Sequence, residues 1–290
     1  CWLGLALVLR VRPGPEGAPG PKAPVWGAAL IAFALAAIGV DAFLIEPEWL
    51  EVRRVKLQSS RVTRPLRILV LADLQTDHIG DYERRVLARI VEEKPDLLLF
   101  AGDYLQCMDN ETQHAEGLAF QAALTEVGFA PPLGAFAVEG DCEARGHDRR
   151  GWRPLFEGTS VEALSGVALI GSSLRVQGLT LAESFVRAPA LPSSERFRIV
   201  IGHRPDFALE PCEADLLLAG HTHGGQVQLP LVGPLVTMSR VPRAWASGEP
   251  TRLPSGATLV VSRGAGMERL TAPRLRFLCR PELLVIEVSP

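Results

Sequence analysis

The chain has 290 residues, of which 47% are hydrophobic, and its formal net charge is −3. This length and apolar content are sufficient for one large domain or two small ones with a well-buried core. The near-neutral charge gives no support to a nucleic-acid partner. Five cysteines form no CxxC pair, so neither a disulfide framework nor a structural zinc motif is predicted.

The N-terminal region is strongly apolar. Residues 1–9 resemble the end of an interrupted membrane segment, and residues 25–45 are apolar throughout except for Asp41. The second stretch is long enough to cross a bilayer core of roughly 30 Å as a helix. A signal peptide is the alternative, but its apolar region is usually shorter, and no small-residue cleavage site stands out. We therefore predict a retained transmembrane helix at 25–45. Basic residues flank both of its ends, which leaves the side of the membrane open.

From residue 67 onward, short apolar runs alternate with amphipathic stretches. The pattern predicts helices at 82–93 and 111–127. Predicted strands are 67–71, 97–100, 135–138, 197–201, 216–219, 258–262, 275–279 and 283–288. Alternation of strands and helices followed by a β-rich region predicts one layered α/β domain over residues 60–290.

Five of the predicted strands end in residues that can bind a metal. These residues are Asp73 with Gln75, Asp103, Asp141 with Cys142 and Glu143, His203, and His221 with His223. The carboxyl ends of parallel strands meet at one crevice, so these side chains are predicted to converge. His221 and His223 are two residues apart, so in an extended segment both imidazoles face one centre. Three carboxylates, one amide and three imidazoles suffice for two divalent cations. Such a pair can hold a hydroxide and polarise a phosphoryl group.

The order Asp-x-Gln, Gly-Asp, Gly-Asp-Cys-Glu, Gly-His and Gly-His-Thr-His resembles that of calcineurin-like metallophosphoesterases. Its Gly-His-Thr-His-Gly-Gly-Gln segment and C-terminal tail are similar to the membrane-associated bacterial branch. The resemblance implies a two-sheet αββα sandwich preceded by the transmembrane helix, in the bacterial inner membrane. It implies a hydrolase that cleaves a phosphate ester or pyrophosphate. Branch members act on phospholipid-like esters and on UDP-2,3-diacylglucosamine, so a phospholipid or nucleotide-sugar lipid is an expected substrate.

The resemblance also implies two ligand sets that share Asp103. The first metal would be held by Asp73, Gln75, Asp103 and His223, and the second by Asp103, Asp141, His203 and His221. Gln75 stands where the family has histidine, and Asp141 stands where it has asparagine. Both changes enrich the site in oxygen ligands, which favours manganese or magnesium over iron or zinc.

Three further residues are candidates for catalysis or substrate binding. Cys142 occupies the position of a family histidine that contacts phosphate and is often assigned as the general acid. A thiol with a pKa of ~8.5 is a mediocre acid at neutral pH, and a small packed residue is an equal alternative. His78 is a weak candidate for the missing proton donor, against a loop residue that caps a helix. Arg263 is a weak candidate for a phosphate contact, against an ordinary surface arginine.

The sequence also suggests two other functions. A catalytically impaired metal-binding or scaffold module that retains the fold is favoured by Gln75 and Cys142. Hydrolysis of a non-phosphate ester is disfavoured by the motif order. Retention of three histidines and three carboxylates favours an active enzyme, because an inactive site gains nothing from clustered like charges.

Overall fold

The computed structural model describes residues 22–145, 151–170, 174–190, 194–270 and 272–290, so the segment 1–9 lies outside the described residues. The chain divides into two units, Cys1–Val40 and Asp41–Pro290. In the first unit, helix α1 (Lys22–Val40) carries exposed apolar side chains on all sides. A candidate membrane span covers Val25–Glu48 with a mean hydropathy of 2.4. Length and composition therefore suit a membrane span, although a signal sequence shares these properties.

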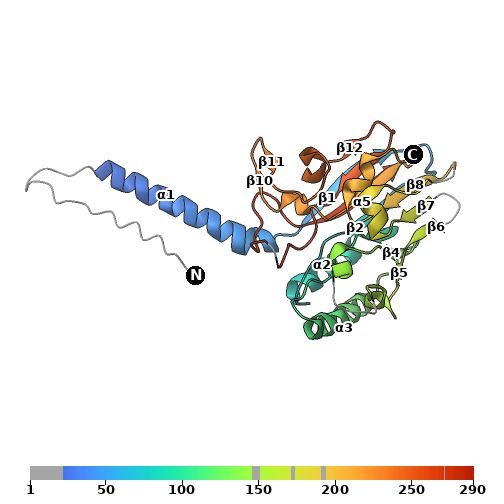
Figure 1. Ribbon diagram of the computed structural model, residues 1–290, viewed down its shortest axis with the longest axis horizontal. Helices are drawn as coiled ribbons and strands as arrows, with labels where there is room; N and C mark the ends of the chain where they lie inside the picture. Colours follow the sequence, from blue (N-terminus) through green and yellow to red (C-terminus); the bar gives the residue numbers. More distant parts are fainter. Residues whose placement is uncertain (1–21, 146–150, 171–173, 191–193, 271) are drawn as a thin grey trace, which may run out of the picture. The chain divides into compact units, whose positions relative to one another are not determined.

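The second unit contains two six-stranded sheets (Figure 1). The first sheet has the order β1 (Glu51–Gln58), β14 (Glu282–Ser289), β2 (Leu66–Leu71), β3 (Leu97–Phe100), β4 (Ala135–Ala137) and β5 (Val161–Ala163). The second has the order β12 (Thr251–Arg252), β13 (Thr258–Val261), β9 (Leu216–Ala219), β8 (Phe197–Ile201), β7 (Leu174–Gly178) and β6 (Gly166–Ile170). Strands β2 to β5 are mutually parallel, as are β13, β9, β8 and β7. Parallel strands carry their carboxyl ends to the same edge, which is where a site can form.

The apolar runs are continuous because both faces of these sheets are buried. Side chains alternate along a strand, so Ile68 and Val70 of β2 enter the core between the sheets. They share that core with Ile199, Leu216 and other residues of the second sheet. The intervening Leu69 and Leu71 belong to the core on the other face of the first sheet.

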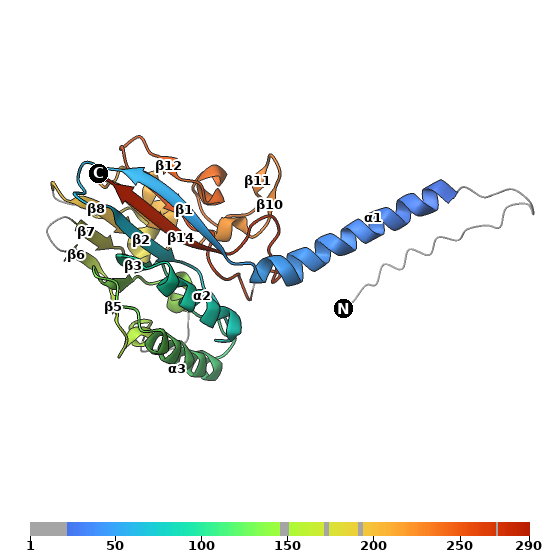
Figure 2. The same cartoon turned by 180° about the vertical axis from the view of Figure 1, so that it is seen from behind.

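Helices cover the outer faces. Helices α2 (Asp81–Glu92) and α3 (Asn110–Val127) lie on the same side of the first sheet (Figures 1 and 2). The outer face of the second sheet packs against a smaller layer that contains the 3-10 helix η4 (Pro205–Leu209). Helix α5 (Leu181–Val186) lies beside η4. The predicted two-sheet α/β sandwich is confirmed.

The sequence-based assignments miss several strands, among them β1, β5, β6 and β7, and one predicted strand is wrong. The segment 275–279 is not a strand, and only Phe277 forms an isolated bridge, to Val227. Its backbone instead bonds to residues near the start of the unit, with the Arg276 N–H donating to Ala42 O at 2.9 Å. Strand β1 was not predicted, because Arg53, Arg54 and Lys56 interrupt its apolar pattern. Within the described part of the chain it pairs with β14 and forms the edge of its sheet, where charged residues are tolerated.

A buried ion pair joins these two strands. The Glu282 carboxylate of β14 accepts hydrogen bonds from Arg53 Nε at 2.9 Å and Arg263 Nε at 2.6 Å. Burial opposes ionisation of Glu282, but the two guanidinium groups outweigh it and hold the pKa of Glu282 below its ordinary value of 4.5. The carboxylate therefore stabilises the fold fully above that value, and the contribution is lost as pH falls through the folded-state pKa.

Glu282→Gln is accordingly expected to lower the free energy of unfolding by about 3 kcal/mol at neutral pH, because it leaves two buried guanidinium groups underpaired. The difference from wild type should shrink as pH falls below about 4.5. Urea unfolding in detergent at several pH values measures both effects. Glu287→Gln is the control, because this residue of the same strand is half-exposed and 3.3 Å from Arg67. Equal losses in the two variants would contradict the prediction.

Candidate metal centre

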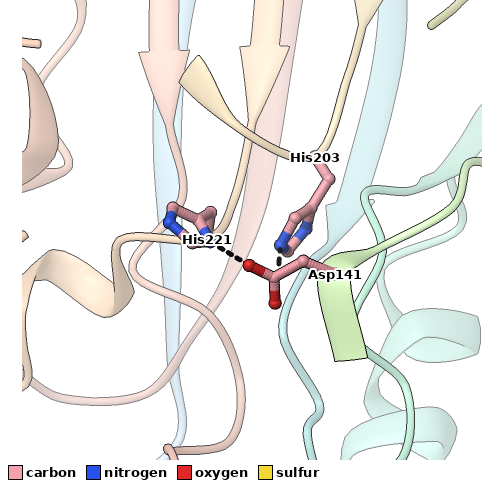
Figure 3. A group of neighbouring side chains, drawn as sticks. All are labelled: Asp141, His203 and His221. Carbon is pink, nitrogen blue, oxygen red and sulfur yellow. Dashed lines mark ion pairs between the residues drawn. The ribbon is translucent and has the colours of Figure 1, made fainter. Parts of the chain in front are cut away.

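The predicted ligands come together from both sheets. Asp73 and Gln75 follow β2, Asp103 follows β3, and Asp141 begins α4 (Asp141–Arg145) shortly after β4. From the second sheet, His203 follows β8, and His221 and His223 follow β9. Figure 3 shows His203 and His221 approaching Asp141 from the facing sheet. The convergence arises because the parallel strands of both sheets carry their carboxyl ends to one edge.

Distances among the ligand atoms define overlapping groups. His221 Nδ1 lies 3.4 Å from Asp141 Oδ2, and His203 Nε2 lies 4.0 Å from Asp141 Oδ1 (Figure 3). His203 Nε2 is also 3.4 Å from Asp103 Oδ2. Asp73, Asp103 and His203 form a second buried group that could hold a metal ion. Asp103 also groups with Asp141 and Cys142, so it lies between the two predicted ligand sets.

Several ligand atoms are buried without a hydrogen-bond partner in the part of the chain that the structure describes. They are Asp73 Oδ2, Gln75 Oε1, His203 Nε2 and His223 Nδ1. An unsatisfied buried polar atom costs about 1–3 kcal/mol. Lone pairs of oxygen and imidazole nitrogen are the donors that divalent cations bind, so these residues fit such cations.

Neighbouring groups orient the free atoms. His203 Nδ1 lies 2.9 Å from Ala101 O, which leaves Nε2 facing the carboxylates. The Gln75 amide donates from Nε2 to Gln106 at 3.1 Å and to Glu268 at 3.0 Å. Its Oε1 is left free by these bonds. Partners of this kind fix the direction of a ligand atom.

The electrostatics are those of an anionic cluster. Burial raises the pKa of Asp73 to about 7. Burial also works against ionisation of Asp103, but the charge of His203 outweighs it and holds the pKa of Asp103 well below its usual range. Burial disfavours a charged His203, yet Asp103, Asp73 and Asp141 raise its pKa to about 10. Burial and the charges of His203 and Arg204 lower the pKa of His221 to about 4. In the absence of a metal, His203 therefore holds a proton where a cation would be favourable.

The backbone at these positions is strained. Left-handed φ values occur at Asp73 (48°), Gln75 (38°), Asp103 (55°), His221 (70°) and His223 (49°). Each such non-glycine residue costs on the order of 1–3 kcal/mol, and clustering of this strain is typical of functional sites. Gly220 permits the close approach, because a Cβ there would lie 2.6 Å from Asp73 Oδ2. Next to it, the His221 N–H donates to Asp73 Oδ1 at 2.8 Å.

Two buried residues, Glu143 and Arg276, hold the ligand loops, whereas the sequence suggested metal binding for the first and a weak phosphate contact for the second. The Glu143 carboxylate accepts from the N–H groups of Asp103 at 3.0 Å, Tyr104 at 2.7 Å and Gly140 at 3.1 Å. Its place at the end of the Gly-Asp-Cys-Glu motif is the feature of the sequence that could have indicated this role for Glu143. Arg276 is fully buried and donates to the carbonyl groups of His223, Arg263, Gly264 and Gly266. Three of these carbonyls lie 10 to 13 residues before Arg276 in the chain, and only that of His223 is distant, so Arg276 joins the two loops.

A cleft of ≈680 Å³ opens onto the centre. Two cationic side chains line it beside the ligands, Arg145 and Arg204. Arg145 pairs with the Asp141 carboxylate, and Arg204 Nη1 lies 3.6 Å from Asp141 Oδ2. The guanidinium of Arg204 stacks over the Phe185 ring with 4.3 Å to the centroid. Leu181, Phe185, Val236 and Met238 make another part of the lining apolar.

The three weaker candidates lie in different environments. His78 is 74% exposed, with Nδ1 3.0 Å from Glu116 Oε1 of α3, and it does not line the cleft. Arg263 pairs with Glu282 and with Glu51, and it does not line the cleft either. The structure therefore does not bring these two residues to the ligands, since nearer carboxylates hold them elsewhere.

Cys142, by contrast, lies in the cluster. It is buried, and its N–H donates to Asp103 Oδ1 at 2.8 Å. Burial and the neighbouring carboxylates raise the pKa of the thiol far above its usual range. The thiol therefore stays protonated at neutral pH and is a poor acid.

Fold and site together define a metal-dependent hydrolase with an anionic ligand cluster under a partly cationic cleft. The chain belongs to the calcineurin-like phosphoesterase family, whose sequence profile matches residues 66–225, more than half of the chain. Members of this family use a dinuclear divalent metal centre, in accordance with the clustered ligands seen here. The predicted family and the predicted phosphoester hydrolase activity are confirmed.

Relatives match nearly the whole chain. The "Uncharacterized metallophosphoesterase YkuE" of Bacillus subtilis (strain 168) is 29% identical over 280 residues, which cover 90% of this chain and 94% of that protein. "Phosphodiesterase YaeI" of Escherichia coli (strain K12) is 29% identical and covers 84% of this chain and 90% of its own length. An "Uncharacterized metallophosphoesterase" of Aquifex aeolicus (strain VF5) is 25% identical over 84% of this chain and 94% of its own.

Proposed function

We propose that this protein is a membrane-anchored phosphoesterase of the bacterial inner membrane that cleaves a lipid-linked phosphate ester. Its two divalent cations would be held by Asp73, Gln75, Asp103, Asp141, His203, His221 and His223. The observation that carries this proposal is the set of buried ligand atoms that lack a partner among the described residues, beside a cleft with two arginines. The apolar stretch Val25–Glu48 supports the anchor.

When bound, the two cations supply an activated water and neutralise charge on the phosphoryl oxygens. The chain's own residues add two functions. Arg204 and Arg145 bind the remaining phosphate oxygens through charge-assisted hydrogen bonds, which form best where water is excluded. Glu143 and Arg276 hold the ligand loops fixed, so that little reorganisation is needed when the substrate enters.

The ligand types favour particular metals and substrates. Three carboxylates and the Gln75 amide make the site rich in oxygen, which favours manganese or magnesium over iron or zinc. The apolar lining from Phe185, Val236 and Met238 suits a substrate whose phosphate is joined to a lipid. The name of the relative YaeI supports a diester. A scaffold that binds metal without catalysis is the second candidate, because the buried Cys142 thiol, whose pKa is raised by burial and nearby carboxylates, is a poor acid.

Metal reconstitution tests the proposal. The full chain, purified in detergent and stripped with a chelator, is expected to regain about two metal ions on addition of Mn²⁺ or Mg²⁺. It should then hydrolyse bis(nitrophenyl) phosphate, and the chelated protein should not. Elemental analysis and nitrophenol release measure the two properties. Bound metal without hydrolysis of any phosphate ester would favour the scaffold, and neither property would refute both functions.

Cys142→His restores the residue found in the family and should accelerate hydrolysis of alkyl phosphate esters about tenfold. A fully aligned proton donor contributes ~10²–10⁴-fold, and a histidine in this buried position is expected to realise part of that. Nitrophenyl esters should respond less, because their leaving group needs no proton. Cys142→Ala is the control and should change both rates little, since the backbone N–H that bonds Asp103 remains. A histidine variant no faster than wild type on alkyl esters would contradict this expectation.

A further inference from the structure

An exposed apolar hairpin borders the cleft. Strands β10 (Gln228–Leu229) and β11 (Gly233–Pro234) pair with each other and, among the described strands, form a separate two-stranded sheet. The hairpin and the residues after it expose a series of large apolar side chains, here called the hairpin patch: Leu231, Val232, Leu235, Val236 and Met238. Leu231 is fully exposed, and Met238 is 75% exposed. Contiguous exposed apolar residues of this kind mark an interaction surface rather than ordinary surface composition.

The conformation of the hairpin tip argues against a purely structural reason for leucine there. The pairing of Leu229 with Gly233 leaves a three-residue loop, and Leu231 in that loop has φ of 68°. Glycine or asparagine adopts this left-handed conformation at much lower cost, and a polar residue would be better solvated. A leucine that is both strained and exposed is therefore disfavoured for folding, which points to a function for its side chain.

A loop links the base of the hairpin to the segment that follows the apolar helix. The Gln228 N–H donates to Phe277 O at 3.0 Å, and the Arg276 N–H donates to Ala42 O at 2.9 Å. The same loop, residues 276–278, is also bound by Glu46, whose carboxylate accepts a hydrogen bond from the Leu278 N–H at 2.8 Å. In both views the hairpin lies at the end of the unit where the chain enters it (Figures 1 and 2).

The segment that follows helix α1 also exposes apolar side chains. Phe43, Leu44 and Ile45 are exposed, and they lie within the candidate span Val25–Glu48. Just beyond it, the guanidinium of Arg280 stacks over Trp49 with 3.7 Å to the ring centroid. Tryptophan and arginine are typical of the interface between lipid and water, where an apolar body and a charged end are both satisfied.

We propose that the hairpin patch and Phe43–Ile45 dock together on a phospholipid bilayer, with the cleft facing the lipid headgroups. The inference rests on the proposed membrane anchor, because Phe43–Ile45 lie within the candidate span Val25–Glu48, which favours a bilayer over a second copy of the chain. Val236 and Met238 belong both to the patch and to the cleft lining. A lipid-linked phosphate can therefore reach the metal ligands while its apolar part stays in contact with the membrane.

Fluorescence quenching by labelled lipid tests the docking. The full chain is reconstituted into vesicles of phosphatidylcholine and phosphatidylglycerol, with an environment-sensitive fluorescent amino acid in place of Leu231. The matched control carries the same probe in place of Leu169, which is also apolar and 59% exposed but lies on edge strand β6. Lipids with a nitroxide near the headgroup are expected to remove most of the emission at position 231 and little at position 169.

The outcomes separate docking from the other proposals. Equal quenching at the two positions, or blue-shifted emission at 231 without quenching, would overturn docking; the latter indicates a protein partner or another segment of this chain. Release of the chain by carbonate washing would refute the anchor, while quenching at 231 on unwashed vesicles would still decide the docking.

A second measurement connects docking to the cleft. Leu231→Asp with Val232→Asp should leave hydrolysis of a soluble nitrophenyl ester unchanged, because neither residue lines the cleft. Hydrolysis of phosphatidylglycerol in vesicles should fall several-fold. Val167→Asp with Leu169→Asp on β6 should affect neither rate. Equal rates on vesicles in both double variants would overturn the inference. A wild-type protein that hydrolyses none of the esters would refute the proposed function alone.

Discussion

Replacement of Asp103 by alanine is expected to remove most of the bound metal and to lower phosphoester hydrolysis by at least ~10³-fold. Each tenfold loss corresponds to about 1.4 kcal/mol, and a divalent metal centre supplies several kcal/mol of charge stabilisation. Asp103 is the carboxylate grouped with both predicted ligand sets, and it lies 3.4 Å from His203. Its removal should therefore weaken both cation positions.

Thermal unfolding provides a readout that is independent of activity. A metal that binds only the folded chain stabilises it by about 2.7 kcal/mol at a concentration 100 times its Kd. Wild type should gain this stability on addition of Mn²⁺, and Asp103→Ala should not. Asp109→Ala is the matched control, because Asp109 is an exposed N-cap of α3 that bonds to Thr112. It should lose about 1 kcal/mol of stability and keep its metal and its activity. Equal metal content in the two variants would contradict the ligand assignment.

Arg204→Ala is expected to lower kcat/KM by about 10²-fold while metal content stays unchanged. The Arg204 guanidinium is nearly buried and lies 3.6 Å from both Asp141 and Asp206, which is beyond hydrogen-bond distance. Among the described residues, the guanidinium donates one hydrogen bond, from Nη2 to Met238 O at 2.6 Å. The buried Nε has no hydrogen-bond partner in the described part of the chain and can donate to a phosphate oxygen. Loss of such a charge-assisted contact costs about 2–5 kcal/mol.

Arg240→Ala is the control for this variant. Arg240 also pairs with Asp206, but it is 66% exposed and does not line the cleft. Its removal should change kcat/KM little. Competitive inhibition by inorganic phosphate should weaken in Arg204→Ala to a similar extent as catalysis, and Arg204→Lys should recover part of both. Similar kinetics for Arg204→Ala and Arg240→Ala would exclude Arg204 as the phosphate-binding residue.

Most of what the sequence predicted depends on neighbouring residues. Strand β3 at Leu97–Phe100 is continuously apolar because both of its faces are buried, and Asp103 follows three residues after its end. The same holds for β9 and the two histidines after it. Fold class, family and the order of the ligands could therefore be predicted from short motifs. The apolar pattern did not predict β1, because this strand is stabilised by pairing with β14, which lies over 200 residues away in the chain.

Partners that are distant in the chain decided the rest. Arg263 and Arg204 are similar as isolated arginines, but Glu282 and Glu51 hold the first, while the second stays beside the cleft. His78 is held by Glu116 of α3 in the same way. The roles of Glu143 and Arg276, and the exposure of Leu231, likewise depend on which loops meet. The sequence by itself determined which residues follow each strand, because that order is covalent. Only the tertiary structure decided which charged side chains remain free to meet a substrate, because each pairs with the nearest opposite charge in space.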